Sequence, residues 1–208
     1  MPRPGALTDE DAHGPVLDSA TRAAMYRLLA RFMDRPPGRS DLEAAAGLRA
    51  EGSELEQAIA SFAAAAAGTS ADEQSVDFHD LFIGLSAGEV VPYASHYDTG
   101  TLNDLALVAV RHDLQRLGLR RRNGISEPED HAASILEAMA ALIDRIGDHS
   151  DSAEQVDAFL ARHVLSWMPR LFRDLARKHE RSLYMALGAL GAAFLQTERA
   201  RLSEGQAH

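Results

Sequence analysis

The sequence predicts an all-α protein, a single-domain bundle of about nine to eleven helices. Apolar residues recur three and four positions apart along most of the chain, which is the spacing of one helix face. No segment alternates apolar and polar residues as a half-buried strand would, and β-branched residues are sparse. Alanine is abundant and 46% of the residues are hydrophobic, which favours helices around a buried core.

The N-terminal segment, residues 1–16, is rich in proline and glycine, so we expect a flexible tail there. A helix follows, with an apolar face from Met25 to Phe32, and the Pro-Pro-Gly run at residues 36–38 ends it. Three Ser-x-x-Glu pairs then fit capping boxes, in which both side chains satisfy backbone groups at a helix start. The three pairs are Ser40 with Glu43, Ser53 with Glu56, and Ser70 with Glu73.

The middle of the chain holds the longest irregular stretch. An apolar helix face ends at Gly84, and residues 84–101 then show no clear period. A connection of this length in a helical domain usually serves a function. The helical period resumes at Leu102 and ends near Gly118, followed by a turn at residues 120–124 that is rich in arginine.

The C-terminal half predicts further helices. Ser126 with Glu129 forms a capping box with Pro128 in the first turn, and this predicts a helix that ends at Gly147. Ser152 with Gln155 opens the next helix, another begins near Ser166, and the last carries an apolar stripe from Leu183 to Phe194. We therefore expect one helical domain over residues 17–202 and a short tail at 203–208.

The net charge of the chain limits the classes of binding partner that we expect. The formal net charge is -10, which disfavours binding to nucleic acid or to an anionic membrane. Residues 71–131 contain 11 acidic and 5 basic side chains, so negative charge gathers around the irregular stretch and suits a cationic partner. The chain has no cysteine, which excludes thiolate chemistry and cysteine-based metal sites. It shows no secretory signal and no apolar run that could span a membrane, so we expect a cytoplasmic protein.

Three short segments occur in a fixed order. They read Leu81-Phe82-Ile83-Gly84, then Pro92-Tyr93-Ala94-Ser95-His96-Tyr97, then Glu127-Pro128-Glu129-Asp130-His131. Taken together, they resemble the TorD/DmsD/NarJ family of redox-enzyme maturation chaperones. The resemblance extends over about residues 20–200 and includes the C-terminal run around Trp167.

The resemblance implies an all-α, TorD-like chaperone and not an enzyme. Members of that family bind the twin-arginine signal peptide of a molybdenum-cofactor oxidoreductase, or its apoprotein, assist cofactor insertion and delay export. They occur as monomers or domain-swapped homodimers. The family's peptide-binding positions correspond here to Pro92, Ser95, Tyr97, Asp130 and His131.

The residue types in these segments suit such a peptide. Glu127, Glu129 and Asp130 are carboxylates that could take guanidinium groups in bidentate fashion. Apolar and aromatic residues could floor a groove for the apolar part of the peptide, and Pro128 completes the turn. This floor would consist of Phe82, Pro92, Tyr93 and Tyr97.

A plainer interpretation stays open for the same residues. Acidic side chains at a helix start are favoured by the helix dipole, by ~0.3–1 kcal/mol each. His131 could act in the site or hold the loop in place through a hydrogen bond to Asp130 or to a carbonyl. Core packing is an equal explanation for Tyr93 and Tyr97, and it is the favoured one for Trp167.

The alternative function is a helical metal-dependent enzyme. Di-iron bundles need two Glu-x-x-His pairs with further carboxylates. This chain has that spacing once, from Glu10 to His13 in the expected tail. A helical DNA-binding regulator is also disfavoured, because residues 1–70 are acidic on balance. We expect no cofactor, no metal site and no nucleic-acid partner.

Overall fold

The computed structural model describes residues 17–84, 88–100, 104–120, 128–147 and 152–205. Within these ranges the chain folds into ten α-helices and two short π-helical segments, and no strand is formed. The all-α prediction and its range of helix numbers are therefore confirmed. No helix in these ranges combines the length and apolar character needed to cross a membrane.

In the N-terminal half, the helices begin and end where the sequence predicted, with one exception. Capping boxes at Ser53 and Ser70 open their helices as expected. The helix expected to be capped by Ser40 is capped two residues earlier, by Gly38, whose N–H donates to the Asp41 carboxylate at 2.8 Å. The elements are α1 (Ser19–Asp34), α2 (Arg39–Ala46), α3 (Glu54–Ala67), α4 (Ala71–Phe78) and the π-helical η2 (His79–Ile83).

Three elements after residue 84 differ from expectation, one of them the helix that begins at Ala132 where the sequence predicted a start at Ser126. A short helix, α5, lies inside the stretch expected to be irregular, and α10 includes residues 203–205, which were expected in the tail. The expected tail at 1–16 and residues 206–208 lie outside the described residues. The elements are α5 (Ala94–Thr99), α6 (Asp104–Arg116), α7 (Ala132–Gly147), α8 (Ala153–Phe159), the π-helical η3 (Leu160–Val164), α9 (Met168–Ala176) and α10 (Ser182–Gly205).

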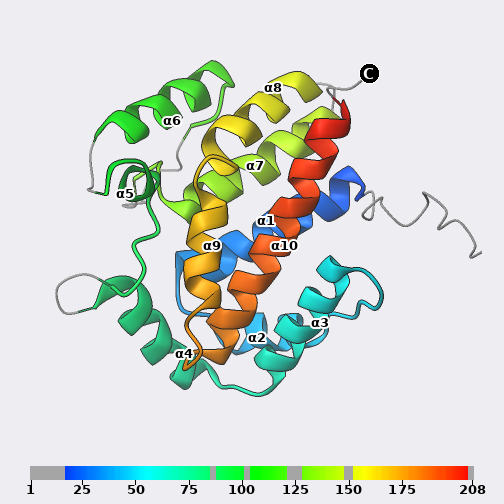
Figure 1. Cartoon of the computed structure of the whole chain (residues 1–208), viewed down its shortest axis with the longest axis vertical. Coiled ribbons are helices and arrows are strands. Elements are labelled where there is room, and N and C mark those ends of the chain that lie inside the picture. Colours follow the sequence, from blue (N-terminus) through cyan, green and yellow to red (C-terminus); the bar gives the residue numbers. More distant parts are fainter. Residues whose placement is uncertain (1–16, 85–87, 101–103, 121–127, 148–151, 206–208) are drawn as a thin grey trace, which may run out of the picture.

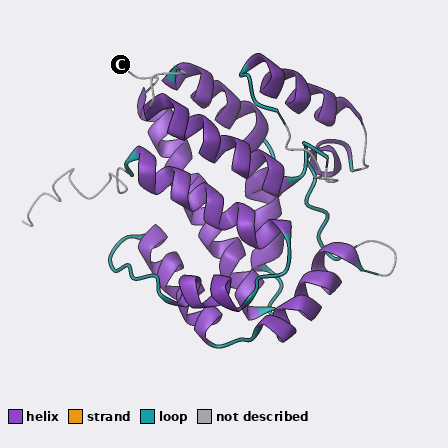
Figure 2. Ribbon diagram, turned by 180° about the vertical axis from the view of Figure 1, so that it is seen from behind, coloured by secondary structure: helices purple, strands orange, loops and turns teal. Residues whose placement is uncertain are grey.

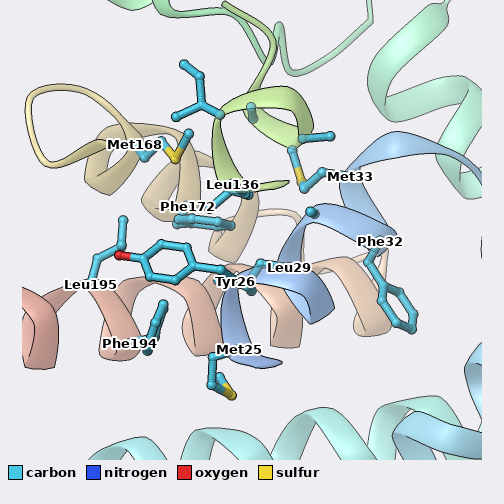
Figure 3. Close-up of a cluster of buried hydrophobic side chains, with 14 of the residues drawn as sticks. Met25, Tyr26, Leu29, Phe32, Met33, Leu136, Met168, Phe172, Phe194 and Leu195 are labelled. Carbon is cyan, nitrogen blue, oxygen red and sulfur yellow. The ribbon is translucent and has the colours of Figure 1, made fainter. Parts of the chain in front are cut away.

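The core lies where α1, α7, α9 and α10 meet (Figures 1 and 2). Side chains from all four helices interlock there (Figure 3). The Tyr26 ring of α1 meets the Phe194 ring of α10 edge-on, with centroids 4.8 Å apart. Trp167 is 1% exposed, which confirms it as a core residue.

A buried ion pair ties the first helix to the last. Glu198 of α10 is 0% exposed, and its carboxylate accepts hydrogen bonds from Arg22 of α1 at 2.7 and 2.8 Å. The Tyr26 hydroxyl donates a third bond at 2.9 Å. Such complete pairing is what makes a buried charge tolerable.

Two glycines set the spacing between α9 and α10. A Cβ atom at Gly188 would lie 2.3 Å from the Ala176 nitrogen, and one at Gly191 would lie 2.4 Å from the Phe172 ring. The two helices therefore make close contact at this end, and Figure 1 shows them separating toward the start of α9. The wider end is lined by larger side chains.

Candidate functional site

Two segments of the sequence resemblance meet in the fold. Tyr93 and His131 form an isolated antiparallel bridge between the stretch before α5 and the turn before α7. The Ala94 N–H donates to the Asp130 carbonyl at 3.0 Å, and the Ala132 N–H donates to the Pro92 carbonyl at 2.8 Å. We call this contact, residues 92–97 with 128–133, the α5–α7 junction.

The junction is closed where an open cleft was expected. Ser95 is 1% exposed, Asp130 3% and His131 6%, and Pro92 is also buried. The physical reason is that the two backbones pair directly, which leaves no room between them. The expectation of a cleft between the two segments is therefore corrected, although their proximity was predicted.

The Asp130 carboxylate is poorly compensated. Among the described residues, this carboxylate accepts one hydrogen bond, from the Ser95 N–H at 3.4 Å. No arginine, lysine or histidine in the described part of the chain pairs with it. A buried carboxylate normally has a cation or several donors, so Asp130 has capacity for a further hydrogen-bond donor.

His131 caps the helix that follows. Its Nδ1 accepts the Ala133 N–H at 3.2 Å, so in the neutral ring the proton resides on Nε2. The His131 carbonyl accepts the Ile135 N–H at 3.1 Å, the first bond of the helix. The expected start of this helix at Ser126 is thereby corrected, because α7 begins at Ala132. Ser126 and Glu127 lie outside the described residues.

Glu129 is occupied by an arginine that sequence reasoning did not single out. Arg111 of α6 donates to both carboxylate oxygens, at 3.2 and 2.8 Å. The Glu129 side chain is 15% exposed and that of Arg111 is 47% exposed. The carboxylate of Glu129 thus already holds a guanidinium in bidentate fashion, at the surface of the junction. Pro128 is half-buried beside it.

Helix α6 presents apolar side chains to solvent next to this pair. Leu105 is 78% exposed and Val108 is 57% exposed, and Val108 lies one turn before Arg111. Apolar spacing predicted a helix here, but such spacing does not show whether another helix covers the apolar residues. These two exposed residues precede Arg111 on α6, and Arg111 pairs with Glu129 of the junction.

Tyr97 links the junction to α9. Its hydroxyl donates to Asp174 at 3.1 Å, and its ring lies 5.5 Å from the Trp167 ring. The Arg170 guanidinium lies 5.7 Å from the Tyr97 ring centroid. Burial and the Asp174 carboxylate raise the pKa of Tyr97, so the phenol stays a neutral donor.

The remaining predicted residues are divided between two places. The Tyr93 ring packs edge-on to the His131 ring, with centroids 4.9 Å apart, and is half-buried in the junction. Phe82 instead packs between Phe78 and Tyr184, at 4.9 and 5.5 Å, in the contact of η2 with α10. Within the described ranges, no three histidine, aspartate or glutamate side chains gather to hold a metal ion.

The chain resembles a known family and several known proteins. Residues 41–173 match the family model described as nitrate reductase delta subunit. The chaperone protein TorD of Vibrio cholerae is 31% identical over 139 residues, which cover 64% of this chain and 63% of the relative. The chaperone protein TorD of Vibrio parahaemolyticus is 25% identical over 138 residues, covering 62% and 64%.

Each of these matches spans less than two thirds of the curated relative. A solved structure shares the fold over a larger part of the chain. A protein from Archaeoglobus fulgidus, assigned to redox enzyme maturation, superposes with a TM-score of 0.58 at 17% identity. The match covers 89% of this chain and 98% of that one.

Proposed function

The chain belongs to the nitrate reductase delta subunit family, and on that premise we propose that it is a cytoplasmic chaperone that binds the twin-arginine signal peptide of a molybdenum-cofactor oxidoreductase. It assists insertion of the cofactor into the apoprotein and delays export, and it is not an enzyme. The names of the TorD relatives support the chaperone role. The α5–α7 junction and the exposed side of α6 support the peptide site.

The two arginines of the peptide bind at the carboxylates of the junction. One guanidinium takes the place of Arg111 on Glu129, which is already shaped for bidentate binding. The other reaches Asp130 when the turn opens, and supplies the donors that this buried carboxylate lacks. Glu127, in the same segment of the sequence, adds a third carboxylate to the proposed site.

The apolar part of the peptide binds along α6. Leu105 and Val108 are exposed on the helix whose Arg111 contacts the junction, so arginines held at Glu129 place the following residues beside them. Tyr93 and Tyr97 form the aromatic border of this surface, whereas Phe82 packs apart from it, in the contact of η2 with α10. Pro92, Ser95, Pro128 and His131 position the two backbones.

One observation carries the proposal: exposed apolar side chains of α6 precede Arg111, which pairs with Glu129, and the neighbouring buried Asp130 has no cation among the described residues. The test is calorimetric titration of the whole protein with a synthetic peptide that carries two adjacent arginines followed by an apolar segment. A counterpart with two lysines serves as the control. We expect the lysine peptide to bind about tenfold more weakly, because an ammonium group cannot bind a carboxylate in bidentate fashion.

Two results would count against the site. Equal affinity for both peptides would mean that the carboxylates do not bind arginine in bidentate fashion in preference to lysine. No measurable heat with any arginine peptide would remove the signal-binding function. The oligomeric state, monomer or domain-swapped homodimer, stays a prediction and is tested separately by light scattering.

A further inference from the structure

We propose that the groove between α9 and α10 is a second docking site, which takes a helix with an apolar face and acidic flanks from a partner protein. The groove has a volume of about 530 Å³ and lies at the wide end of the helix pair. It does not involve Glu129, Asp130 or α6, so it stands independently of the signal-peptide proposal.

The shape of the groove fits a helix. One wall carries Ser166, Pro169, Arg170 and Arg173, and the other carries Ala192, Leu195, Gln196 and Arg199. The α10 set has the i, i+3, i+4, i+7 spacing of one helix face and runs for about 10 Å along that helix. In the other wall, Pro169, Arg170 and Arg173 lie on α9, and Ser166 lies in the turn before it. A docked helix presents an apolar stripe with the same spacing over the same length.

The floor of the groove is apolar. The apolar residues that line it are Leu165, Pro169, Ala192 and Leu195, of which the first three are half-buried and Leu195 is buried in the core. Gly188 and Gly191, which precede Ala192 and Leu195 on α10, bring α10 close to α9 beside the groove. An apolar floor favours a partner with apolar side chains over a simple inorganic anion.

The rims of the groove are positive. Arg173 comes from α9 and Arg199 from α10, and both are exposed, whereas the exposed Arg170 of α9 already pairs with Asp98 at 3.8 Å. Arg173 is held by the Pro169 carbonyl at 3.1 Å and Arg199 by the Leu165 carbonyl at 3.3 Å. Neither pairs with a carboxylate in the described part of the chain.

Most other arginines in the structure do have acidic partners. Arg181 binds Asp77 and Asp80, and Arg201 binds Asp157. Two uncompensated guanidiniums on opposite rims of one groove are therefore unusual in a chain of net charge -10. The guanidinium N–H groups of Arg173 and Arg199 can pair with carboxylates on the two flanks of a docked partner helix.

The test uses fluorescence anisotropy and the intact protein. The probe is a labelled helical peptide with leucines at i, i+3, i+4 and i+7 and glutamates on both flanks. A counterpart has glutamines in place of the glutamates. We expect the acidic probe to bind, and the double variant Arg173→Glu with Arg199→Glu to weaken it about tenfold or more. The glutamine peptide should bind more weakly than the acidic one.

Arg49→Glu is the matched control, because Arg49 is also exposed and also bonded to backbone carbonyls, but lies between α2 and α3. It should leave probe affinity unchanged. The milder pair Arg173→Gln with Arg199→Gln repeats the test if charge reversal lowers the melting temperature. The twin-arginine peptide should bind all these variants as it binds the wild type, which separates the two proposals.

Three outcomes would overturn the proposal. The acidic probe fails to bind the wild type, or the double variant binds it as well as the wild type does. In the third, phosphatidylglycerol vesicles sediment the wild-type protein but not the double variant, while the probe shows no binding. That result would make the groove a membrane-binding surface instead.

Discussion

The contact of α1 with α10 and the α5–α7 junction each bury a carboxylate, but the two are compensated very differently. Glu198 is 0% exposed and has two bonds from Arg22 and one from Tyr26. Asp130 is 3% exposed and has one long bond from a backbone N–H. Two buried acids in one small protein therefore have opposite degrees of pairing.

The difference indicates what each acid is for. Removing a carboxylate from water is costly unless a cation and hydrogen bonds replace the water. At Glu198 the fold supplies both, so the residue serves the structure. At Asp130 the fold supplies little, so a ligand with a guanidinium would gain the interaction that the protein leaves unmade.

The largest expected effect is at the fully paired site. Glu198→Ala should lower the free energy of unfolding by ~3–5 kcal/mol, because Arg22 is then left buried without a partner. Urea denaturation measures this. Replacing both residues, Arg22→Met with Glu198→Leu, should recover much of the loss. A cost below about 1 kcal/mol for Glu198→Ala would show that the pair is not a structural tie.

The next effect is on binding. Asp130→Asn keeps an oxygen for the Ser95 N–H but removes the charge, so stability should change little. Affinity for the twin-arginine peptide should fall about tenfold, or ~1.4 kcal/mol. Calorimetric titration of this variant measures its affinity for the peptide, and urea denaturation measures its stability. Strong destabilisation with unchanged affinity would reverse the roles that we assign to Asp130 and Glu198.

A third buried acid lies between these extremes and should show in the pH dependence. Burial lowers the pKa of His163, which donates to Asp113 at 2.8 Å. Burial alone would raise the pKa of Asp113, but bonds from His163 and the charge of Arg162 lower it on balance. Both groups then bind protons more readily in the unfolded chain.

Stability should therefore fall as pH drops below about 6.5, where an unfolded histidine takes up a proton, and again near pH 4 as the unfolded aspartate does. One proton limits the first loss to about 1.4 kcal/mol per pH unit. Denaturation midpoints from pH 8 to 5 give the slope. His163→Gln should flatten it, and an unchanged slope in that variant would place the titrating group elsewhere.

The smallest effect concerns the arginine that occupies Glu129. Arg111→Gln removes a competitor for the peptide, and a partly exposed ion pair is worth ~0–1 kcal/mol. Peptide affinity should therefore rise by up to about fivefold. Arg116→Gln on the same helix is the control, because Arg116 pairs with Asp113 and not with Glu129. Weaker binding to Arg111→Gln would show that Arg111 supports the site instead of masking it.

Local chemistry explains what the sequence could predict. Serine caps at Ser53, Ser70 and Ser152 depend on residues three positions away, and each was predicted correctly. Gly84 ends its helix with a φ of 56°, a conformation that glycine adopts without strain. The proximity of Pro92 and Asp130 followed from the family resemblance and is confirmed in the fold.

Contacts between distant elements explain what the sequence could not predict. The Arg111–Glu129 pair and the Tyr97–Asp174 bond depend on how α6 and α9 lie against the junction. The start of α7 was misplaced because Ser126 and Glu129 fit a capping box, whereas α7 begins after the backbone pairing at His131. Arg173 and Arg199 lie on two different helices, so their positions in the sequence do not predict that they flank one groove.

The most direct test of the account is hydrogen–deuterium exchange on the whole protein with and without the twin-arginine peptide. The account predicts slower exchange at residues 93–97, 104–112 and 129–133. It predicts no change in α1 or α10, where the Arg22–Glu198 pair is complete without a ligand. Protection confined to α9 and α10, with residues 129–133 unchanged, would contradict the assignment of the junction as the peptide site.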